Sequence, residues 1–461
     1  MESASSPATP APSKHAVVIG ASIAGCLAAR VLRERFERVT VLERNTIPSE
    51  PAPRKGVPQE NHVHLLLQRG KHILANLFPG FLNELEQKGA LVADLSRDIR
   101  TFQHGRWRQR FDTDIRAHYC SRGLFDSVIR QRLALVPGIT FISQAEVASL
   151  RSEDGGRHIQ GVTLTQEGKT TTMEADLVVD ASGRGSRTEQ WFKSLGIASP
   201  ERSVVAANLG YATRIYRQLP RYTNQWKVLL VLPKPPYSRR MGVISPIEDQ
   251  RWMVTTSGWL GDHPPSDEGD YLEFLRNLPV PDIYEVIREA EPLSEISLFR
   301  MPGGLRRHYE RVTPWPGGFL VIGDALCSVN PIYSQGMSIC AMEAEVLNDH
   351  IDALARPSGP ACHAVQQALA QVVAPAWGLA ESEDMRFPEL GGERPLSLRW
   401  QHWYGERLVE ASARNRDVSV ALLRVTNLMD DGRQLQRPGM MMRVLTESLK
   451  QRLFGSSEVE G

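Results

Sequence analysis

Short apolar runs and a helical pattern alternate at the start of the chain. The run HAVVIG, which begins at His15, is apolar and β-branched and ends in glycine. Such a run is typical of a strand that is buried on both faces. Residues 23–36 follow with apolar positions at helical spacing, and a second buried run, RVTVLE, ends at Glu43. This order predicts a strand, a tight turn, a helix and a parallel strand, which together form a βαβ unit.

The buried-strand pattern returns twice, in ADLVVDASG and in GGFLVIGDA. Between these runs, residues 204–260 alternate apolar and polar positions and are rich in aromatic side chains, which predicts an antiparallel sheet. The first unit is therefore expected to be discontinuous, with this sheet inserted into it. Helices are predicted at residues 61–90, 121–133, 268–291 and 335–354, and an antiparallel meander at residues 139–172.

The expected fold class is α/β, with a discontinuous Rossmann-like domain, an inserted antiparallel β-sheet substrate domain and a mainly helical C-terminal region. Residues 1–14, rich in Ser, Pro and Ala, are expected to be a disordered lead-in. The Rossmann-like domain is assigned to residues 15–80, 116–200 and 300–355, the substrate domain to residues 81–115 and 201–299, and the helical region to residues 356–461.

Composition bears mainly on partners and on compartment. The chain has 461 residues and a formal net charge of +1, which gives no electrostatic reason to expect nucleic acid or an anionic membrane as the main partner. Its five cysteines are scattered without a C-x-x-C pair, which argues against a disulfide framework or a zinc site and fits a reducing compartment. No run approaches the roughly 20 apolar residues of a membrane span, and the first residues lack the apolar core of a signal peptide. We therefore predict a cytoplasmic protein without a transmembrane segment.

A glycine loop separates the first predicted strand from its helix. A tight turn at this place lets backbone N–H groups meet a pyrophosphate at the positive end of the helix. Ser22 takes the place of the middle glycine of the dinucleotide fingerprint and is small enough for the same approach. Glu43 ends the second strand and is placed to accept hydrogen bonds from both hydroxyls of an adenosine ribose, although a solvated strand end is the alternative. The predicted dinucleotide-binding residues are Gly20, Ser22, Ile23, Ala24, Gly25, Glu43 and Arg44.

A second motif follows the last buried strand and is one that NAD enzymes do not need. It consists of Gly323 and Asp324, then Pro331, then Gly336 and Met337. A carboxylate at the end of a buried parallel strand is placed to bind a polyol such as a ribityl chain. The helix N-terminus that follows can hold the negative charge of a reduced flavin. The alternative is an ordinary strand-to-helix turn capped by aspartate.

A third motif, DASGRGSR, runs from Asp180 to Arg187 at another strand end, where Asp180 and Gly183 are predicted to border the cofactor. With the three motifs in this order, the chain resembles the FAD-dependent monooxygenases of the aromatic-hydroxylase superfamily. The resemblance extends to about residue 355 and implies that the Rossmann-like domain binds FAD. The form D-A-S-G is closest to the squalene-epoxidase-like, geranylgeranyl-reductase-like and halogenase-like branches.

A narrower likeness begins in RKGVPQ, residues 54–59, with His62 and His64 just beyond it. Together with the segments GYATRIYR (210–217), GDHPPSDEG (261–269) and NPIYSQGMS (330–338), it resembles the flavin epoxidases of polyether-ionophore biosynthesis. Those proteins usually carry glycine where this chain has Ser334, and a serine there narrows the space beside the flavin.

The resemblance also implies places for several side chains. Arg54 and Lys55 would pair with the pyrophosphate or lie near the flavin, with solvated loop charge as the alternative. Arg122 would contact FAD from the start of its helix, with a surface salt bridge as the alternative. No catalytic residue is singled out, and the candidates near the flavin are Gln59, His64, Pro331 and Ser334.

Other conspicuous side chains carry less information. His62 and His64 lack a nearby Cys or carboxylate partner in the sequence, so no metal is predicted. A place near the flavin or the substrate pocket is expected, with a plain structural role as the alternative. Cys327 is expected to be a small buried residue. Aromatic residues of the predicted sheet either wall an apolar pocket or belong to the core; they are Tyr211, Tyr216, Trp252 and Trp259.

The end of the chain predicts an amphipathic helix. Met441, Leu445, Leu449 and Leu453 share one helical face. This face is expected to dock on the protein body, and binding to a membrane surface is the alternative.

The resemblance implies an FAD-dependent monooxygenase that inserts one oxygen atom from O2, through a flavin C4a-hydroperoxide, into an apolar, unsaturated or aromatic small molecule of secondary metabolism. Epoxidation and hydroxylation both remain open. The sequence has one dinucleotide fingerprint, so NAD(P)H docks transiently or a separate flavin reductase supplies reduced flavin. The alternatives are a flavin-dependent reductase of prenyl-type double bonds and a non-catalytic FAD-binding protein. A halogenase is disfavoured because the chain has no W-x-W-x-I-P segment.

Overall fold

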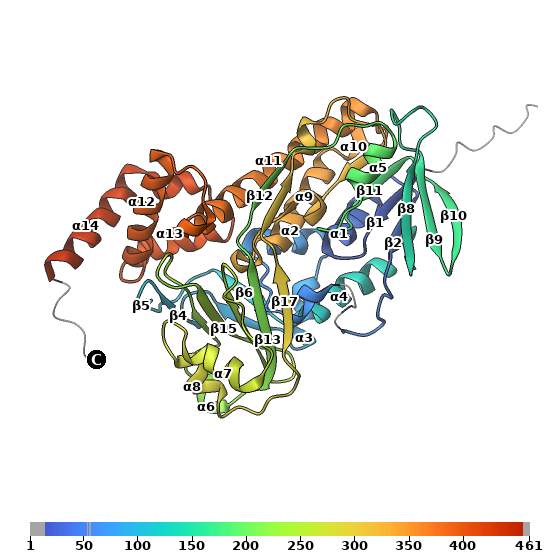
Figure 1. The fold of residues 1–461 in the computed structure, drawn as a ribbon. Helices are drawn as coiled ribbons and strands as arrows, with labels where there is room; N and C mark the ends of the chain where they lie inside the picture. Colours follow the sequence, from blue (N-terminus) through green and yellow to red (C-terminus); the bar gives the residue numbers. More distant parts are fainter. Residues whose placement is uncertain (1–13, 53, 55–56, 455–461) are drawn as a thin grey trace, which may run out of the picture.

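The computed structural model describes residues 14–454 except residues 53, 55 and 56 (Figure 1). At its centre is a five-stranded parallel sheet in the order β19-β11-β1-β2-β7. The β1, β11 and β19 strands are buried along their whole length, which is why they read as unbroken apolar runs. The strands are β1 (His15–Ile19), β2 (Arg38–Glu43), β7 (Ile139–Ser143), β11 (Leu177–Asp180) and β19 (Phe319–Val321).

Helices and a small sheet cover the two sides of this parallel sheet (Figure 1). The helices pack on one another, with α1 between α4 and α9, and α11 against α9 and β19. The small antiparallel sheet lies on the other side, where β8 contacts β2 and β9 contacts β11. These elements are α1 (Ile23–Leu32), α4 (Arg122–Ala134), α9 (Gly336–Asp349), α11 (Gly359–Asp384), β8 (Ala145–Arg151), β9 (Gly161–Gln166) and β10 (Lys169–Glu174).

Two predictions for this half of the chain need correction. Residues 139–143 do not begin an antiparallel meander, because β7 pairs in parallel with β2 at the edge of the main sheet. A strand at the edge of a sheet is less buried than a central one, so its apolar residues are interrupted by polar ones. Such a pattern is also typical of an antiparallel strand. Residues 61–90 are helical only in α2 (Gln68–Leu77) and α3 (Phe81–Gln87), which are separated by a turn at Gly80 with φ +79°.

A second, seven-stranded sheet has the order β17-β13-β16-β15-β14-β4-β5. All of its pairings are antiparallel except the pairing of β14 with β4. The strands are β4 (Ile99–Gln103), β5 (Arg106–Trp107), β13 (Leu209–Arg217), β14 (Val228–Val231), β15 (Arg240–Ile247), β16 (Arg251–Gly258) and β17 (Ser297–Met301).

The two faces of this sheet belong to different cores. Tyr216 and Trp252 pack on the face covered by α7 (Glu268–Arg276) and α8 (Asp282–Ile287). Tyr211 and Trp259 belong to a second cluster, which also includes Val63, Leu65 and Ile332 from segments next to the parallel sheet. The four aromatic residues therefore divide between a structural core and a face that looks toward the first domain.

Short elements connect these two sheets. A strand pair, β3 with β6, and a three-stranded sheet, β12-β18-β20, link the segments that cross between them. The remaining short elements are β3 (Leu91–Asp94), β6 (Arg116–Tyr119), α5 (Thr188–Ser194), β12 (Arg202–Val205), α6 (Pro220–Thr223), β18 (Gly304–Arg307), β20 (Cys327–Ser328) and α10 (Ile351–Leu354).

The C-terminal region is helical, as expected, and its last three helices project from the body (Figure 1). They are α12 (Leu396–Ser412), α13 (Arg416–Thr426) and α14 (Pro438–Phe454), and they share a small core that contains Val444. Of the face predicted to dock, Met441 packs against this core, whereas Leu445 and Leu449 are exposed. The side chain of Leu453 lies outside the described residues. None of the helices within the described part of the chain is both long and apolar enough to cross a membrane.

Candidate functional site

The register of the parallel sheet brings the three sequence motifs together. Ile19, the last residue of β1, pairs with Leu42 of β2 and with Asp180 of β11, and Asp180 pairs with Val321 of β19. Parallel strands all end at the same edge, so the segments that follow them lie side by side. In open α/β sheets, this is the edge at which ligands bind.

The glycine loop at this edge has the backbone that a close ligand approach requires. Gly20 has φ +106°, and a Cβ there would lie 2.5 Å from the carbonyl oxygen of Ala181. A Cβ on Gly25 would lie 1.9 Å from the carbonyl oxygen of Gly20. Both positions therefore need glycine. Ser22 has φ −88° and ψ −175°, an ordinary extended conformation, so this position of the fingerprint needs only a small side chain.

Glu43 fixes the glycine loop from the end of β2. Its Oε2 accepts a hydrogen bond of 3.0 Å from the backbone N–H of Ala21, and its Oε1 accepts one of 3.0 Å from the N–H of Asn45. The solvated-strand-end alternative does not hold, because Glu43 is buried. Oε1 also accepts a 3.4 Å hydrogen bond from Asn45 Nδ2, whereas Oε2 keeps a second lone pair that can accept from a ribose hydroxyl.

A hollow opens beside Glu43 at the edge of the sheet. Ile19, Leu42 and Trp191 provide apolar surface, while Arg44 and Arg187 stand at its exposed side. This mixture suits a planar base attached to a ribose that Glu43 binds. The sequence did not indicate that Ala145, Glu146, Val147 and Trp191 also line this hollow. The first three lie in β8, which follows β7 and reaches the hollow because β7 belongs to the parallel sheet.

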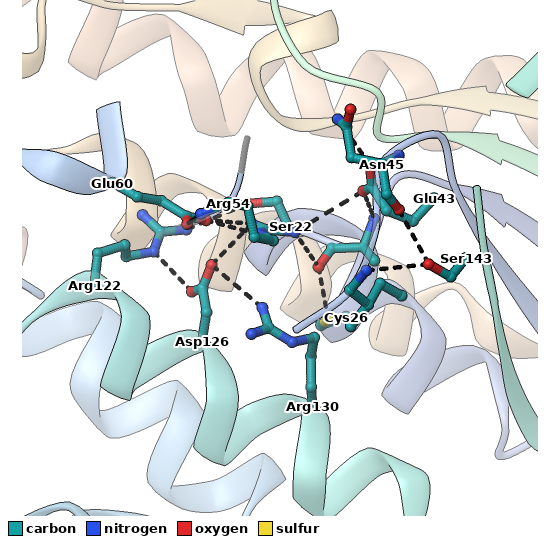
Figure 2. Close-up of polar contacts among 12 residues, drawn as sticks. Ser22, Cys26, Glu43, Asn45, Arg54, Glu60, Arg122, Asp126, Arg130 and Ser143 are labelled. Carbon is teal, nitrogen blue, oxygen red and sulfur yellow. Dashed lines mark hydrogen bonds and ion pairs between the residues drawn. The ribbon is translucent and has the colours of Figure 1, made fainter. Parts of the chain in front are cut away.

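A buried cluster of charges stands behind the glycine loop (Figure 2). The guanidinium of Arg54 donates to Glu60 Oε1 from Nε at 2.8 Å, to Asp126 Oδ2 from Nη2 at 3.1 Å, and to the carbonyl oxygen of Ala21 at 3.0 Å. Arg54 is 4% exposed, so the solvated-charge alternative is wrong for this residue. Its neighbour Lys55 lies outside the described residues.

Arg122 joins this cluster from the first residue of α4. Its Nε donates to Asp126 Oδ1 at 2.7 Å, and its Nη2 lies 3.4 Å from Ser22 Oγ in the glycine loop. Burial acts to raise the pKa of Asp126, but the charges of Arg122 and Arg54 lower it on balance, so its carboxyl stays ionised. Arg122 is therefore not a surface salt bridge. It places a cation at the turn where a pyrophosphate would lie.

The structure gives Asp180 a role different from the predicted one. Its Oδ1 accepts from the N–H of Ser182, and its Oδ2 accepts from the hydroxyls of Ser186 and Thr188. The side chain is fully buried and holds the turn that follows β11, so we no longer expect it to contact the cofactor. Gly183 in that turn has φ +83°, and Ser182 and Gly185 line the hollow directly.

Asp324 lies just beyond β19 in a short 3-10 turn, Gly323–Ala325. Burial raises the pKa of its carboxyl, and the positive charges of Arg122 and Arg184 act in the opposite direction. Glu343 of α9 anchors the same turn, because its Oε2 accepts a 2.9 Å hydrogen bond from the N–H of Gly323. The other oxygen of Glu343 is buried without a partner among the described residues.

His64 and His62 occupy different surroundings and do not form a pair of metal ligands. The Nδ1 of His64 donates to the carbonyl oxygen of His62 at 2.8 Å, so its Nε2 carries the lone pair. Burial and the charge of Arg122 lower its pKa to about 3. His62 bonds Thr213 through Nδ1, lies against the rings of Tyr211 and Phe299, and has a pKa lowered to about 4 by burial. Both histidines are neutral at physiological pH.

The segment 330–337 completes the edge of the sheet. Pro331–Tyr333 form a 3-10 turn, and Ser334 follows in the left-handed region with φ 54° and ψ 25°. Glycine adopts this conformation without cost, so Ser334 is a strained replacement for the glycine of the similar proteins. Gln335 precedes the first turn of α9, where Gly336 and the buried Met337 lie, and its Oε1 has no partner among the described residues. Gln59, half-buried in a 3-10 turn, is the remaining predicted flavin neighbour.

Two further features lie apart from the predicted flavin contacts. Burial raises the pKa of Cys327 to about 12, so it is an unreactive thiol. Within the described ranges, His104, Glu406 and Glu410 place possible metal ligands within 4.8 Å of one another. The ammonium group of Lys234 lies 3.3 Å from Glu406, so this group already has its cation.

The glycine loop provides a direct test of the cofactor assignment. Gly25→Ala would push a methyl group into the Gly20 carbonyl, so FAD affinity should fall by about 100-fold or more, whereas Ser22→Gly should change it by less than about threefold. Flavin content after purification and FAD titration of the apoprotein measure both effects. Equal affinities of the two variants would contradict the assignment.

Glu343 makes a prediction about pH. Burial raises the pKa of Glu343 from 4.5 to about 8, so the unfolded chain ionises this residue in that interval while the folded protein does not. Its contribution to stability is therefore present below pH 4.5 and is lost as the pH rises toward 8. Glu343→Gln cannot ionise and should unfold with a free energy about 1–3 kcal/mol above wild type near pH 9, with little difference near pH 5.

Chemical unfolding of the FAD-loaded protein at both pH values measures this effect. Glu345→Gln is the matched control, because Glu345 lies on the same helix in an exposed pair with Arg69. An unchanged pH dependence in Glu343→Gln would show that the buried carboxyl is already ionised.

The comparisons with known proteins agree with this geometry. Residues 16–188 match the family described as FAD dependent oxidoreductase. Protein Rv3254 of Mycobacterium tuberculosis is 29% identical over 85% of this chain and 84% of its own length. Squalene epoxidase 3 of Arabidopsis thaliana is 24% identical over 73% of this chain, which spans 60% of that relative's length.

Solved structures share the fold. The p-nitrophenol 4-monooxygenase PnpA of Pseudomonas putida superposes with a TM-score of 0.64 at 15% identity, over 90% of this chain and 98% of that one. The flavin-dependent brominase Bmp2 gives a TM-score of 0.61 at 16% identity, over 95% of this chain and all of that one. The family match, the relatives and the fold agree that this chain is an FAD-dependent oxidoreductase, similar in sequence to squalene epoxidases and in fold to flavin monooxygenases.

Proposed function

We propose that this protein transfers one oxygen atom from O2 to an apolar, unsaturated or aromatic small molecule, by epoxidation or hydroxylation. One observation carries the proposal. The segments that follow β1, β11 and β19 lie at one edge of the parallel sheet, and the segment after β19 contacts the face of the seven-stranded sheet that contains Tyr211 and Trp259. Ile332, in the segment after β19, packs in one cluster with Tyr211 and Trp259 of that sheet. A cofactor at the strand ends would therefore face an apolar wall.

The residues at the edge fit an extended dinucleotide. Gly20 and Gly25 leave room for a pyrophosphate at the N-terminus of α1, with Arg122 beside it. Glu43 would bind the adenosine ribose and Asp324 the ribityl chain, while segment 331–337 would border the flavin ring. When bound, FAD supplies the reduction of O2 and the transfer of oxygen. The task of the protein is to orient both reactants and to keep water away.

The side chains near the expected flavin ring support an apolar substrate. Leu209, Val243 and Met301 belong to the cluster that faces the segment after β19. His62 and His64 are uncharged because burial lowers their pKa values. An alkene would react there without a base. The likeness to polyether epoxidases favours such a substrate. A phenol would need a base, and the lowered pKa values of His62 and His64 make both poor bases.

The electron source and the compartment are part of the proposal. Either NAD(P)H docks transiently or a separate flavin reductase provides reduced flavin, because the sequence has one dinucleotide fingerprint. The cysteines of the described chain are all free thiols, which supports a reducing compartment such as the cytoplasm. Residues 15–80, 116–200 and 300–355 would form the FAD-binding domain and residues 81–115 and 201–299 the substrate domain, followed by the helical region 356–461.

Two other activities are possible on this fold, halogenation and the reduction of prenyl double bonds, and the experiment below distinguishes them. Halogenases share the fold, as the brominase shows, but this chain lacks the W-x-W-x-I-P segment. A reductase of prenyl double bonds would use the same flavin site without inserting oxygen.

The decisive experiment uses reduced, FAD-loaded protein mixed with ¹⁸O2 and squalene as a probe alkene. We expect a transient flavin absorbance that differs from both the oxidised and the reduced forms, and a product that contains one ¹⁸O atom. A protein that takes up no FAD would end the proposal. Saturated product under anaerobic conditions would instead identify a reductase, and a halogenated product with added bromide would identify a halogenase.

Asp324 gives a second test of the same site. Asp324→Ala removes the carboxylate expected to bind the ribityl chain, so FAD affinity should fall by about 10–100-fold. Asp352→Ala is the control, because Asp352 lies on the surface in a pair with Arg35 and should leave FAD affinity unchanged. If the two variants bind FAD equally well, Asp324 has another role.

A further inference from the structure

Asp384 is a buried carboxylate in an unfavourable place. It is the last residue of the 26-residue helix α11 and is 1% exposed. The end of a helix carries partial negative charge, which repels a carboxylate. Burial raises the pKa of Asp384, and hydrogen bonds from Trp259, Asn330 and Tyr333 act to lower it. Both the helix dipole and burial disfavour a carboxylate at this position, so Asp384 is expected to serve a purpose other than the stability of the helix.

Three donors converge on one oxygen of this carboxylate. Asp384 Oδ1 accepts from Asn330 Nδ2 at 2.9 Å, from Trp259 Nε1 at 3.1 Å and from the Tyr333 hydroxyl at 3.1 Å. Trp259 follows β16 of the seven-stranded sheet, whereas Asn330 and Tyr333 belong to the segment after β19. One carboxylate therefore joins α11, the proposed substrate wall and the proposed flavin segment.

Asp384 also decides which way the amide of Asn330 points. An ionised carboxylate only accepts hydrogen bonds, so the NH2 group of Asn330 must face Asp384. This leaves Asn330 Oδ1 to accept from the N–H of Ile332 and from the hydroxyl of Tyr211, both at 3.2 Å. The first of these bonds caps the turn Pro331–Tyr333, which leads into Ser334 in its left-handed conformation.

We propose that Asp384 is a positioning residue for the flavin-facing segment 331–334. Through the orientation of the Asn330 amide, it holds the turn in the conformation that receives the cofactor. This inference rests on the proposed function, in which that segment borders FAD. It assigns a role to a residue of the C-terminal region, far along the chain from the three sequence motifs.

The chemistry predicts which substitution harms the turn and which one preserves it. In Asp384→Asn, the amide oxygen can take the place of Oδ1 and accept from Trp259, Tyr333 and Asn330, because all three donors meet that one oxygen. Asp384→Leu is similar in size but offers no acceptor. The Asn330 amide then loses the partner that fixes its orientation, and the cap of the turn is weakened.

The test compares FAD affinity across these variants. We expect Asp384→Leu to weaken FAD binding by about 10–100-fold, and Asp384→Asn to stay within about threefold of wild type. The visible circular dichroism of bound flavin should change in Asp384→Leu and stay as in wild type in Asp384→Asn. Glu383→Gln is the control, because Glu383 is the preceding residue and pairs with Arg386 near the surface.

Tyr333→Phe keeps the proposal testable if Asp384→Leu does not fold, because it removes one donor without changing a charge. We expect it to weaken FAD binding by about threefold or more. An Asp384→Leu variant that melts at lower temperature but keeps wild-type FAD affinity would show that Asp384 only ties α11 to the body. An equal loss of FAD affinity in Asp384→Asn and Asp384→Leu would also overturn the proposal. Wild-type protein that binds no FAD would instead refute the proposed function.

Discussion

The parallel pairing of β1 with β2 and β11, and of β11 with β19, is the constraint on which the rest of the site depends. It gives four strand ends one common edge, although the segments that follow them are far apart in the sequence. The contact of Gly25 with the carbonyl of Gly20 presses α1 onto this edge, so that the helix N-terminus points at the place where a pyrophosphate would lie.

Buried charged residues fix the conformation of the loops that follow the strands at this edge. Arg54, Arg122 and Asp126 form a network under the glycine loop, and Glu343 anchors the turn after β19. Ionised groups are costly to bury, and paired networks add little net stability compared with apolar packing. Their concentration around one edge is better explained by the need for loops of a single conformation beside a cofactor. Asp384 extends the same principle to the segment 331–334.

The second sheet contributes a surface of a different kind. One of its faces forms a closed core with α7 and α8, and the other presents apolar side chains toward the first domain. His62, a neutral histidine of the segment before α2, bonds Thr213 of this sheet. This division separates the part of the sheet that stabilises the fold from the part that would select a substrate. An uncharged wall is compatible with many apolar molecules, which agrees with the variety of chemistry found on this fold.

Much of the fold was determined by local sequence, because runs such as HAVVIG and GGFLVIGDA indicate both that a strand forms and that it is buried. Ser22 could be accepted in the glycine loop because the backbone at that position needs no positive φ. Tertiary structure decided what local patterns do not contain: the parallel pairing of β7, the inward turn of Asp180, the burial of Arg54 and the meeting of Asp384 with Asn330. Each depends on partners outside the local pattern, and whether a charged side chain faces solvent, a ligand or another charge is settled only when distant segments pack together.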